Sequence, residues 1–199
     1  MESVLDESLY WRFSLAVYQG EGVARSCLAL QDGIGLDVNV LLMSLLAARW
    51  HRRPIERGEL EQAESLARPW RQDVVAPLRL VRRRLKSGPP PTPDPRTGAL
   101  RDGIKAAELQ AEQIEQQVLA AWIDALAPAA APRAARPEDC LDTAGRVVDL
   151  YLASSPGRGD AGALRDCART VARAAADYRD ALLSSPPAGP SKARAMMVR

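Results

Sequence analysis

The stretch CLALQDGIGLDVNVLLMSLLAARWHRRP, residues 27–54, decides the fold, because two apolar helical segments meet in it across a short polar turn. The second segment, over 38–53, is almost uninterrupted apolar sequence, with Asp37 placed to cap its start and Pro54 to end it. A helix that is apolar nearly all round must be surrounded by other elements. We therefore expect 38–53 to be the central helix of the molecule.

Apolar residues at helical spacing predict further helices on both sides of this segment. Their ranges are 6–20, 22–31, 56–67, 70–86, 100–125, 138–153 and 160–183. The helix over 22–31 should stop at Asp32-Gly33, a break is expected at Arg68-Pro69, and Pro77 should kink or break the helix that follows. With an aromatic fraction of only 5%, the composition favours close helix packing over β-sandwiches. The fold class is therefore all-α, an irregular bundle of about six or seven helices.

Proline-rich stretches divide the chain. The sequence SGPPPTPDP, residues 87–95, should form an extended spacer, and a second break follows over 128–137. A chain of 199 residues can bury one sizeable core, or one core plus a small helical unit. We predict a helical core domain over 1–126 that contains the spacer, a C-terminal helical pair over 137–184, and a disordered tail over 185–199.

Between the two breaks, apolar residues recur at alternating spacings of four and three, as in a coiled-coil seam. They are Leu100, Ile104, Ala107, Ala111, Ile114, Val118, Ala121 and Ala125. Because half of these positions are alanine, we expect the seam to pack within the bundle, with homo-oligomer formation as the alternative.

The turn between the two apolar segments holds the candidate ligand-binding residues Gln31, Asp32, Asp37 and Asn39. Carboxylates and amides at a helix start could hold a cation or hydrogen-bond a small polar ligand. The favoured alternative is structural: Asp37 caps the next helix, Asp32 closes the previous one, and Asn39 bonds neighbouring backbone. No EF-hand spacing is present, and we predict neither a metal nor a cofactor.

A second candidate site is basic. Residues 68–101 hold nine basic side chains against two acidic ones. The basic-surface candidates are Arg79, Arg82, Arg83, Arg84 and Lys86, which could follow the phosphates of RNA or meet an acidic partner. The favoured alternative is a solvated helical face that the acidic helix over 102–124 neutralises.

The remaining reactive residues give little support to catalysis. His51 lies at the end of the central helix among arginines, where a cation suits the negative end of the helix dipole. It has no second histidine or paired nucleophile, so we assign no catalytic residue. Cys27, Cys140 and Cys167 are widely spaced, which favours a reduced, cytoplasmic protein over a disulfide framework. The longest apolar run, over 38–48, is too short to span a bilayer.

Two motifs resemble the signature of an uncharacterised proteobacterial family, a domain of unknown function. The first, F-S-x-x-x-Y, is formed by Phe13, Ser14 and Tyr18. The second is C-x-x-L-Q-D-x-x-G-x-D-V-N-x-L-L, formed by Cys27, Leu30, Gln31, Asp32, Gly35, Asp37, Val38, Asn39, Leu41 and Leu42. The resemblance covers residues 8–86; it implies an all-α protein and carries no established activity.

Three functions remain as hypotheses. The first is a non-enzymatic adaptor or regulator of the cytoplasm that presents a helical groove and a basic face to a protein partner. The second is RNA or ribosome contact through the helix over 79–86, although a formal charge of +2 argues against a wholesale nucleic-acid binder. The third is a small-ligand-binding protein or enzyme that uses Asp32, Asp37 and Asn39.

Overall fold

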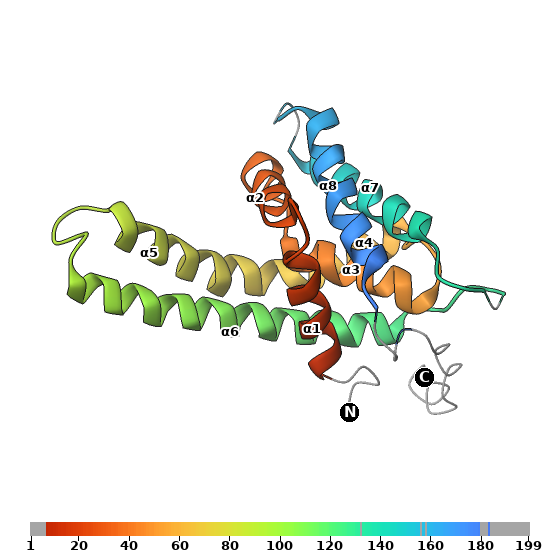
Figure 1. Ribbon diagram of the computed structural model, residues 1–199, viewed down its shortest axis with the longest axis horizontal. Helices are drawn as coiled ribbons and strands as arrows, with labels where there is room; N and C mark the ends of the chain where they lie inside the picture. Colours follow the sequence, from red (N-terminus) through yellow and green to blue (C-terminus); the bar gives the residue numbers. More distant parts are fainter. Residues whose placement is uncertain (1–6, 132, 156, 158, 180–182, 184–199) are drawn as a thin grey trace.

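The computed structural model describes residues 7–131, 133–155, 157, 159–179 and 183 (Figure 1). Its elements are α1 (Glu7–Tyr18), α2 (Val23–Ile34), α3 (Val38–His51), α4 (Arg57–Trp70), the π-helical segment η1 (Arg71–Val75), α5 (Ala76–Ser87), α6 (Pro95–Ala125), α7 (Pro137–Ser154) and α8 (Ala161–Asp177). Since α4, η1 and α5 form one continuous rod, the described residues make seven helices and contain no strand. The predicted all-α class is confirmed, and the predicted tail over 185–199 lies outside the described residues.

α3 is the central helix, as its apolar sequence predicts. Helices α1, α4, α6, α7 and α8 all pack on it, and every residue from Asn39 to Ala48 is buried. Asp37 caps its start: Oδ1 accepts the backbone N–H of Asn39 at 2.8 Å. The helix ends at His51, two residues before the predicted end.

α2 continues beyond Asp32-Gly33, where it was predicted to stop. It ends instead at Gly35, whose φ of 68° lies in the left-handed region and whose N–H bonds the carbonyl of Gln31. Asp32 therefore belongs to the last turn of α2, and the turn that leads into α3 is only Gly35–Asp37.

The chain does not break at Arg68-Pro69, contrary to the sequence prediction, and Pro77 lies inside α5. The π-helical segment lies between the two prolines, and Ala76 N–H bonds the carbonyl of Arg71, five residues earlier. Each proline removes one backbone donor, and a local change of hydrogen-bond spacing allows the rod to continue. Such segments are often found at functional sites.

The proline-rich stretch after Ser87 is a turn and not the extended spacer that was predicted. Thr92 N–H bonds the carbonyl of Pro89 at 3.2 Å, and α6 begins directly afterwards at Pro95. The chain thereby reverses, and α5 and α6 pack along each other as a hairpin that projects from the body of the molecule (Figure 1). The hairpin therefore places the acidic helix α6 against the basic helix α5.

α7 and α8 share the core of the N-terminal helices. Buried residues such as Val147 of α7 and Val171 of α8 belong to the same apolar cluster as Phe13 and Leu45. α8 ends at Asp177, earlier than predicted. The ring of Tyr178, the next residue, packs edge-on against the ring of Phe13, with 5.3 Å between the ring centroids. The division into domains over 1–126 and 137–184 stays a prediction about independent folding.

Candidate functional site

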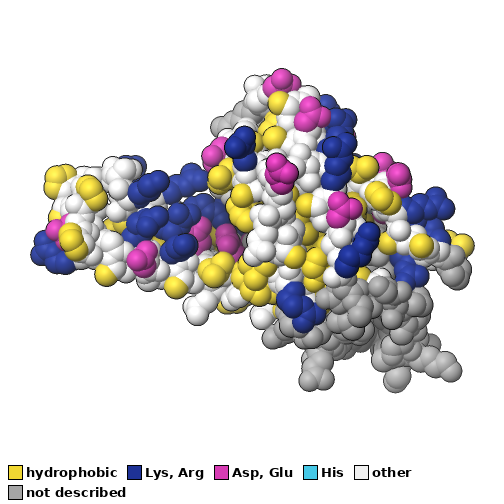
Figure 2. All heavy atoms as spheres, viewed as in Figure 1, with side chains coloured by type: hydrophobic (Ala, Val, Ile, Leu, Met, Phe, Trp, Pro, Cys, Tyr) yellow, Lys and Arg dark blue, Asp and Glu magenta, His cyan; other side chains and the backbone are white. Residues whose placement is uncertain are grey.

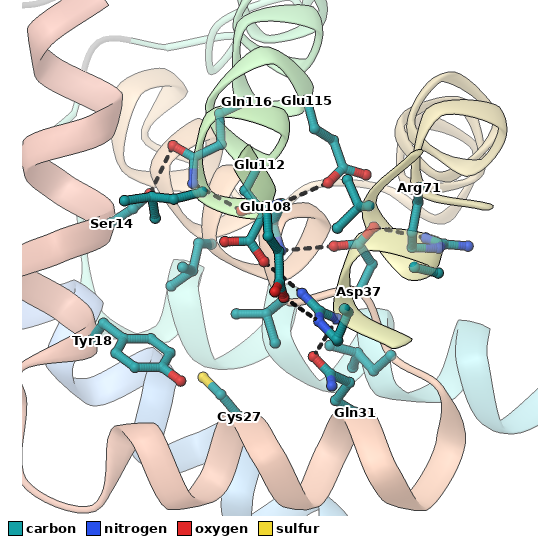
Figure 3. Close-up of a pocket in the computed structure, with 18 of the residues that line it drawn as sticks. Ser14, Tyr18, Cys27, Gln31, Asp37, Arg71, Glu108, Glu112, Glu115 and Gln116 are labelled. Atoms are coloured by element: carbon teal, nitrogen blue, oxygen red, sulfur yellow. Dashed lines mark hydrogen bonds and ion pairs between the residues drawn. The ribbon is translucent and has the colours of Figure 1, made fainter. Parts of the chain in front are cut away.

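A cavity of about 600 Å³ lies between α1, α2, the start of α3 and the η1–α5–α6 hairpin (Figure 3). This volume falls within the range of small-molecule sites, about 300–1,000 Å³. Large apolar side chains form much of its wall: Trp11, Leu15, Leu28, Leu36, Leu42 and Leu109. Polar side chains from α3 and α6 meet at one end of it, which we call the floor and define as Asp37, Asn39, Glu115 and Gln116.

Three of the four predicted ligand-binding residues line this cavity, namely Gln31, Asp37 and Asn39. Asp32 is not among its lining residues. Its exposed carboxylate faces Arg83 on the hairpin at 3.4 Å. Because α2 continues through this region, Gln31 and Asp32 point about 100° apart, and the fold separates them.

Asp37 uses both of its carboxylate oxygens. While Oδ1 caps α3, Oδ2 accepts a hydrogen bond from Arg71 Nη1 at 2.8 Å. The side chain is only 5% exposed. The capping role that the sequence suggested is therefore present, together with a buried ion pair that the sequence did not predict.

Arg71 stands at the start of η1 and connects three helices. Besides Asp37, it donates to Glu64 of α4 at 2.7 Å, and Glu64 accepts a further hydrogen bond from the hydroxyl of Tyr151 on α7. Burial raises the pKa of Glu64, but the hydrogen bonds from Arg71 and Tyr151 outweigh it and hold that pKa below its usual range. Glu64 therefore stays ionised beside Arg71.

Glu115 brings an uncharged carboxyl group to the floor. Its Oε2 accepts from Asn39 Nδ2 at 2.7 Å, while Oε1 is buried and faces no donor among the described residues. Burial, and then the charge of Asp37, raises the pKa of Glu115 to about 9. At pH 7 the raised pKa therefore favours the protonated, uncharged form of Glu115.

The floor continues through two amides to α1. Gln116 Nε2 donates to Asn39 Oδ1 at 2.9 Å, and Ser14 Oγ donates to Gln116 Oε1 at 3.3 Å (Figure 3). Asn39 thus has its donor and its acceptor engaged by side chains of α6, and not by neighbouring backbone as the sequence alternative proposed. The floor is a connected network of hydrogen bonds, which fixes the orientation of its members.

These contacts exist because α6 turns a polar face inward. Glu108, Glu115 and Gln116 are buried, whereas Ile114 and Val118 of the predicted seam are 43% and 40% exposed. The expectation that the seam packs within the bundle is therefore wrong at these two positions, and also at Leu100, Ala121 and Ala125, which are exposed. The spacing of four and three that predicted the seam also joins residues 108, 112, 115, 119 and 122, which were the missed signal.

The hairpin pairs the first arginines of the basic helix with the acidic helix. Arg79 donates to Glu108 at 2.8 Å, to Gln31 at 2.8 Å and to Glu112 at 2.5 Å, and Arg82 pairs with Glu108 as well. Burial raises the pKa of Glu108, but its hydrogen bonds from Arg82 and Arg79 leave that pKa below its usual range. This neutralisation is what the alternative reading of the basic stretch described.

The five basic-surface candidates thus separate into two groups. Arg79, Arg82 and Arg83 line the cavity, and the first two are engaged by glutamates. Arg84 and Lys86 are exposed away from it and have no ion-pair partner among the described residues. Figure 2 shows lysine and arginine side chains gathered along the hairpin beside the body.

His51 lies outside the cavity. Its buried ring bonds the carbonyl of Ile123 through Nε2 at 2.8 Å. Burial lowers the pKa of His51, so the ring is neutral at pH 7 and is not the cation that we expected at the helix end.

Among the described residues, no three histidine, cysteine or acidic side chains are grouped to hold a metal ion. None of the described helices has both the length and the hydropathy to cross a membrane.

Comparison with known proteins gives a match to one family model, over the region that contains the cavity. A family model described as "Protein of unknown function (DUF2390)" matches residues 9–119. The matched region contains every residue that lines the cavity, from Trp11 to Gln116, and ends before α7. No curated protein and no solved structure matches the chain.

Proposed function

The chain belongs to the DUF2390 family of proteins of unknown function, and we propose that it binds a small ligand in the cavity that this family region encloses. One observation carries the proposal: a cavity of about 600 Å³ joins apolar walls to a floor that holds a buried, uncharged carboxyl group. A concave apolar site with a few convergent polar groups and a strongly shifted pKa is the usual form of a ligand site.

The floor supports this proposal because it is held in place before any ligand arrives. Asn39 is fixed by Glu115 and Gln116, and Asp37 by Arg71, so these side chains lose little freedom on binding. Glu115 Oε1 is a polar atom of the floor that has no hydrogen-bond partner among the described residues. A hydroxyl group of a ligand could supply that partner, since it can donate and accept.

The test is a thermal-shift screen of a metabolite library, followed by calorimetry on each compound that raises Tm. Leu28→Trp narrows the cavity at its rim, and Leu66→Trp is its matched control, since both leucines are 49% exposed and only Leu28 lines the cavity. We expect the Leu28 variant alone to weaken binding, by about tenfold or more. Equal affinity in both variants would place the ligand elsewhere.

A protein partner is the second candidate, because apolar side chains at the rim are well exposed. Leu15, Leu28 and Leu109 are 44%, 49% and 46% exposed and could receive the apolar face of a partner helix. The test is a pull-down at low and high salt with wild type and the Leu28→Trp variant. A partner that survives high salt and is lost with this variant would support the adaptor hypothesis.

We also propose a cytoplasmic location. It is supported by Cys27, Cys140 and Cys167, which are all free thiols.

A further inference from the structure

The side of the cavity formed by the hairpin carries two cations, Arg83 and Lys105, that form no buried ion pair among the described residues. Within the described part of the chain, Arg83 of α5 pairs only with Asp32, at 3.4 Å, and both side chains are more than half exposed, so water weakens this pair. Lys105 of α6 also lines the cavity, is exposed, and has no ion-pair partner among the described residues.

Arg83 and Lys105 lie at the same level of the hairpin. Arg82 pairs with Glu108 across it, and Lys105 is three residues before Glu108, hence on the same face of α6. Arg83 follows Arg82 directly on α5. Both cations therefore lie within about one helical turn of this ion pair, on the side toward the end of the hairpin, and both line the cavity. Figure 2 shows basic side chains gathered along the hairpin.

The balance of charge around the cavity is positive. Its lining cations are Arg71, Arg79, Arg82, Arg83 and Lys105, and its lining carboxylates are Asp37, Glu108, Glu112 and Glu115, the last of which holds a proton. The first three cations are matched by carboxylates in direct contact. No lining carboxylate matches Arg83, whose exposed partner Asp32 lies outside the cavity lining, or Lys105.

The wall beyond these cations is apolar. Leu28 lies one turn before Asp32 on α2, and Leu109 lies one turn after Lys105 on α6, and both line the cavity. A ligand that enters beside the two cations therefore meets leucine side chains next. The rim of the cavity thus places two cations beside apolar side chains.

We propose that the ligand is a small amphipathic anion, whose carboxylate or phosphate head binds Arg83 and Lys105 while its apolar body lies against Leu28 and Leu109. This proposal rests on the proposed ligand-binding function and adds the chemical class. Both cations can form charge-assisted hydrogen bonds to such a head, and the half-exposed rim leucines lose water to its body.

The experiment uses four probes with the same saturated ten-carbon chain: decanoate, decyl phosphate, decan-1-ol and decyltrimethylammonium. Binding to the full chain is measured by calorimetry below the concentrations at which the probes form micelles. We expect at least one of the two anions to bind about tenfold more tightly than the alcohol, and the cation to bind more weakly still. Comparison of decanoate with decyl phosphate identifies the preferred head.

The variant Arg83→Gln/Lys105→Gln tests the two residues, and Arg84→Gln/Lys86→Gln is its control with the same change of charge. We expect the first to weaken binding of the anion about tenfold and to leave the alcohol unchanged, whereas the second changes neither. Equal losses in the two variants would mean a general charge effect and would overturn the assignment.

The remaining outcomes separate the two proposals. If the alcohol binds as well as the anions and Leu28→Trp weakens both, the cavity binds ligands but the anionic class is wrong. If no probe binds, the class is also wrong, and the library screen still tests ligand binding. If Leu28→Trp leaves anion binding unchanged, the anion binds elsewhere and its assignment to this cavity is overturned.

Discussion

Asp37 and Arg71 lie 34 residues apart in the sequence and form a buried ion pair of 2.8 Å at the edge of the cavity. The pair joins the start of the central helix to the π-helical segment between two prolines. Since Asp37 also caps α3, one carboxylate fixes both the helix start and the position of the long α4–η1–α5 rod. The floor of the cavity depends on this contact.

Replacing Arg71 by Met should strongly destabilise the fold. The change leaves Asp37 buried without its cation and Glu64 with only the half-exposed Arg68, and breaking such a buried pair costs about 3–5 kcal/mol. Urea unfolding followed by circular dichroism measures the loss. Arg68→Met is the control, because Arg68 contacts the same Glu64 but is 54% exposed, and it should cost less than about 1 kcal/mol. Similar losses in the two variants would contradict the central role of Arg71.

The two roles of Asp37 can be separated by comparison with a second helix cap. Asp160 caps α8 in the same way, accepting the N–H of Gly162 at 2.8 Å, and is exposed. Asp160→Ala should therefore cost only the cap, about 1 kcal/mol. Asp37→Ala also removes one of the two carboxylates that pair with the buried Arg71, which keeps Glu64, and it should cost about 2 kcal/mol or more in the same urea experiment. If both variants lose the same amount, Asp37 is a cap and nothing else.

The central helix was predictable because its signal is local. Apolar residues over 38–53, a capping aspartate and a terminating proline all lie within one short stretch, and the structure differs only at the last two residues. The break at Arg68-Pro69 was predicted from an equally local rule, but a π-helical segment accommodates both prolines. The rule for proline says that this residue disfavours the interior of a helix. It does not predict that a π-helical segment next to the proline can let the helix continue.

Only some of the cavity residues could be predicted, because the others enter the site through packing of the hairpin helices against the rest of the fold. Gln31, Asp37 and Asn39 were found from their place between two helices, but Glu115, Gln116 and Arg71 were not. Glutamates and glutamines on a helix are ordinarily exposed, so their burial on α6 becomes visible only when α5 folds against it. The antiparallel pairing also decided that Arg79 and Arg82 meet glutamates.

The hairpin should depend on Arg79 far more than on the arginines near its end. Arg79→Gln removes contacts to Glu108, Glu112 and Gln31, and we expect a loss of about 2 kcal/mol, measured by thermal unfolding. Arg84→Gln carries the same change of charge at an exposed position without an ion pair among the described residues, so it should stay within about 0.5 kcal/mol. An equal loss at both positions would show that net charge, and not the ion pairs, stabilises the hairpin.

Glu115→Gln should change how stability depends on pH. The folded state raises the pKa of Glu115 from 4.5 to about 9, so between these values the folded chain holds a proton that the unfolded chain has released. The contribution of Glu115 is therefore complete below pH 4.5 and is lost progressively as the pH rises toward about 9. Glutamine keeps the shape of the protonated acid: its oxygen can accept from Asn39, and its amide is an uncharged donor in place of the carboxyl O–H. The variant should thus gain stability over wild type steadily from pH 5 to pH 8 in urea unfolding, and match it near pH 4. Parallel pH profiles for the two proteins would mean that Glu115 is ionised in the folded state.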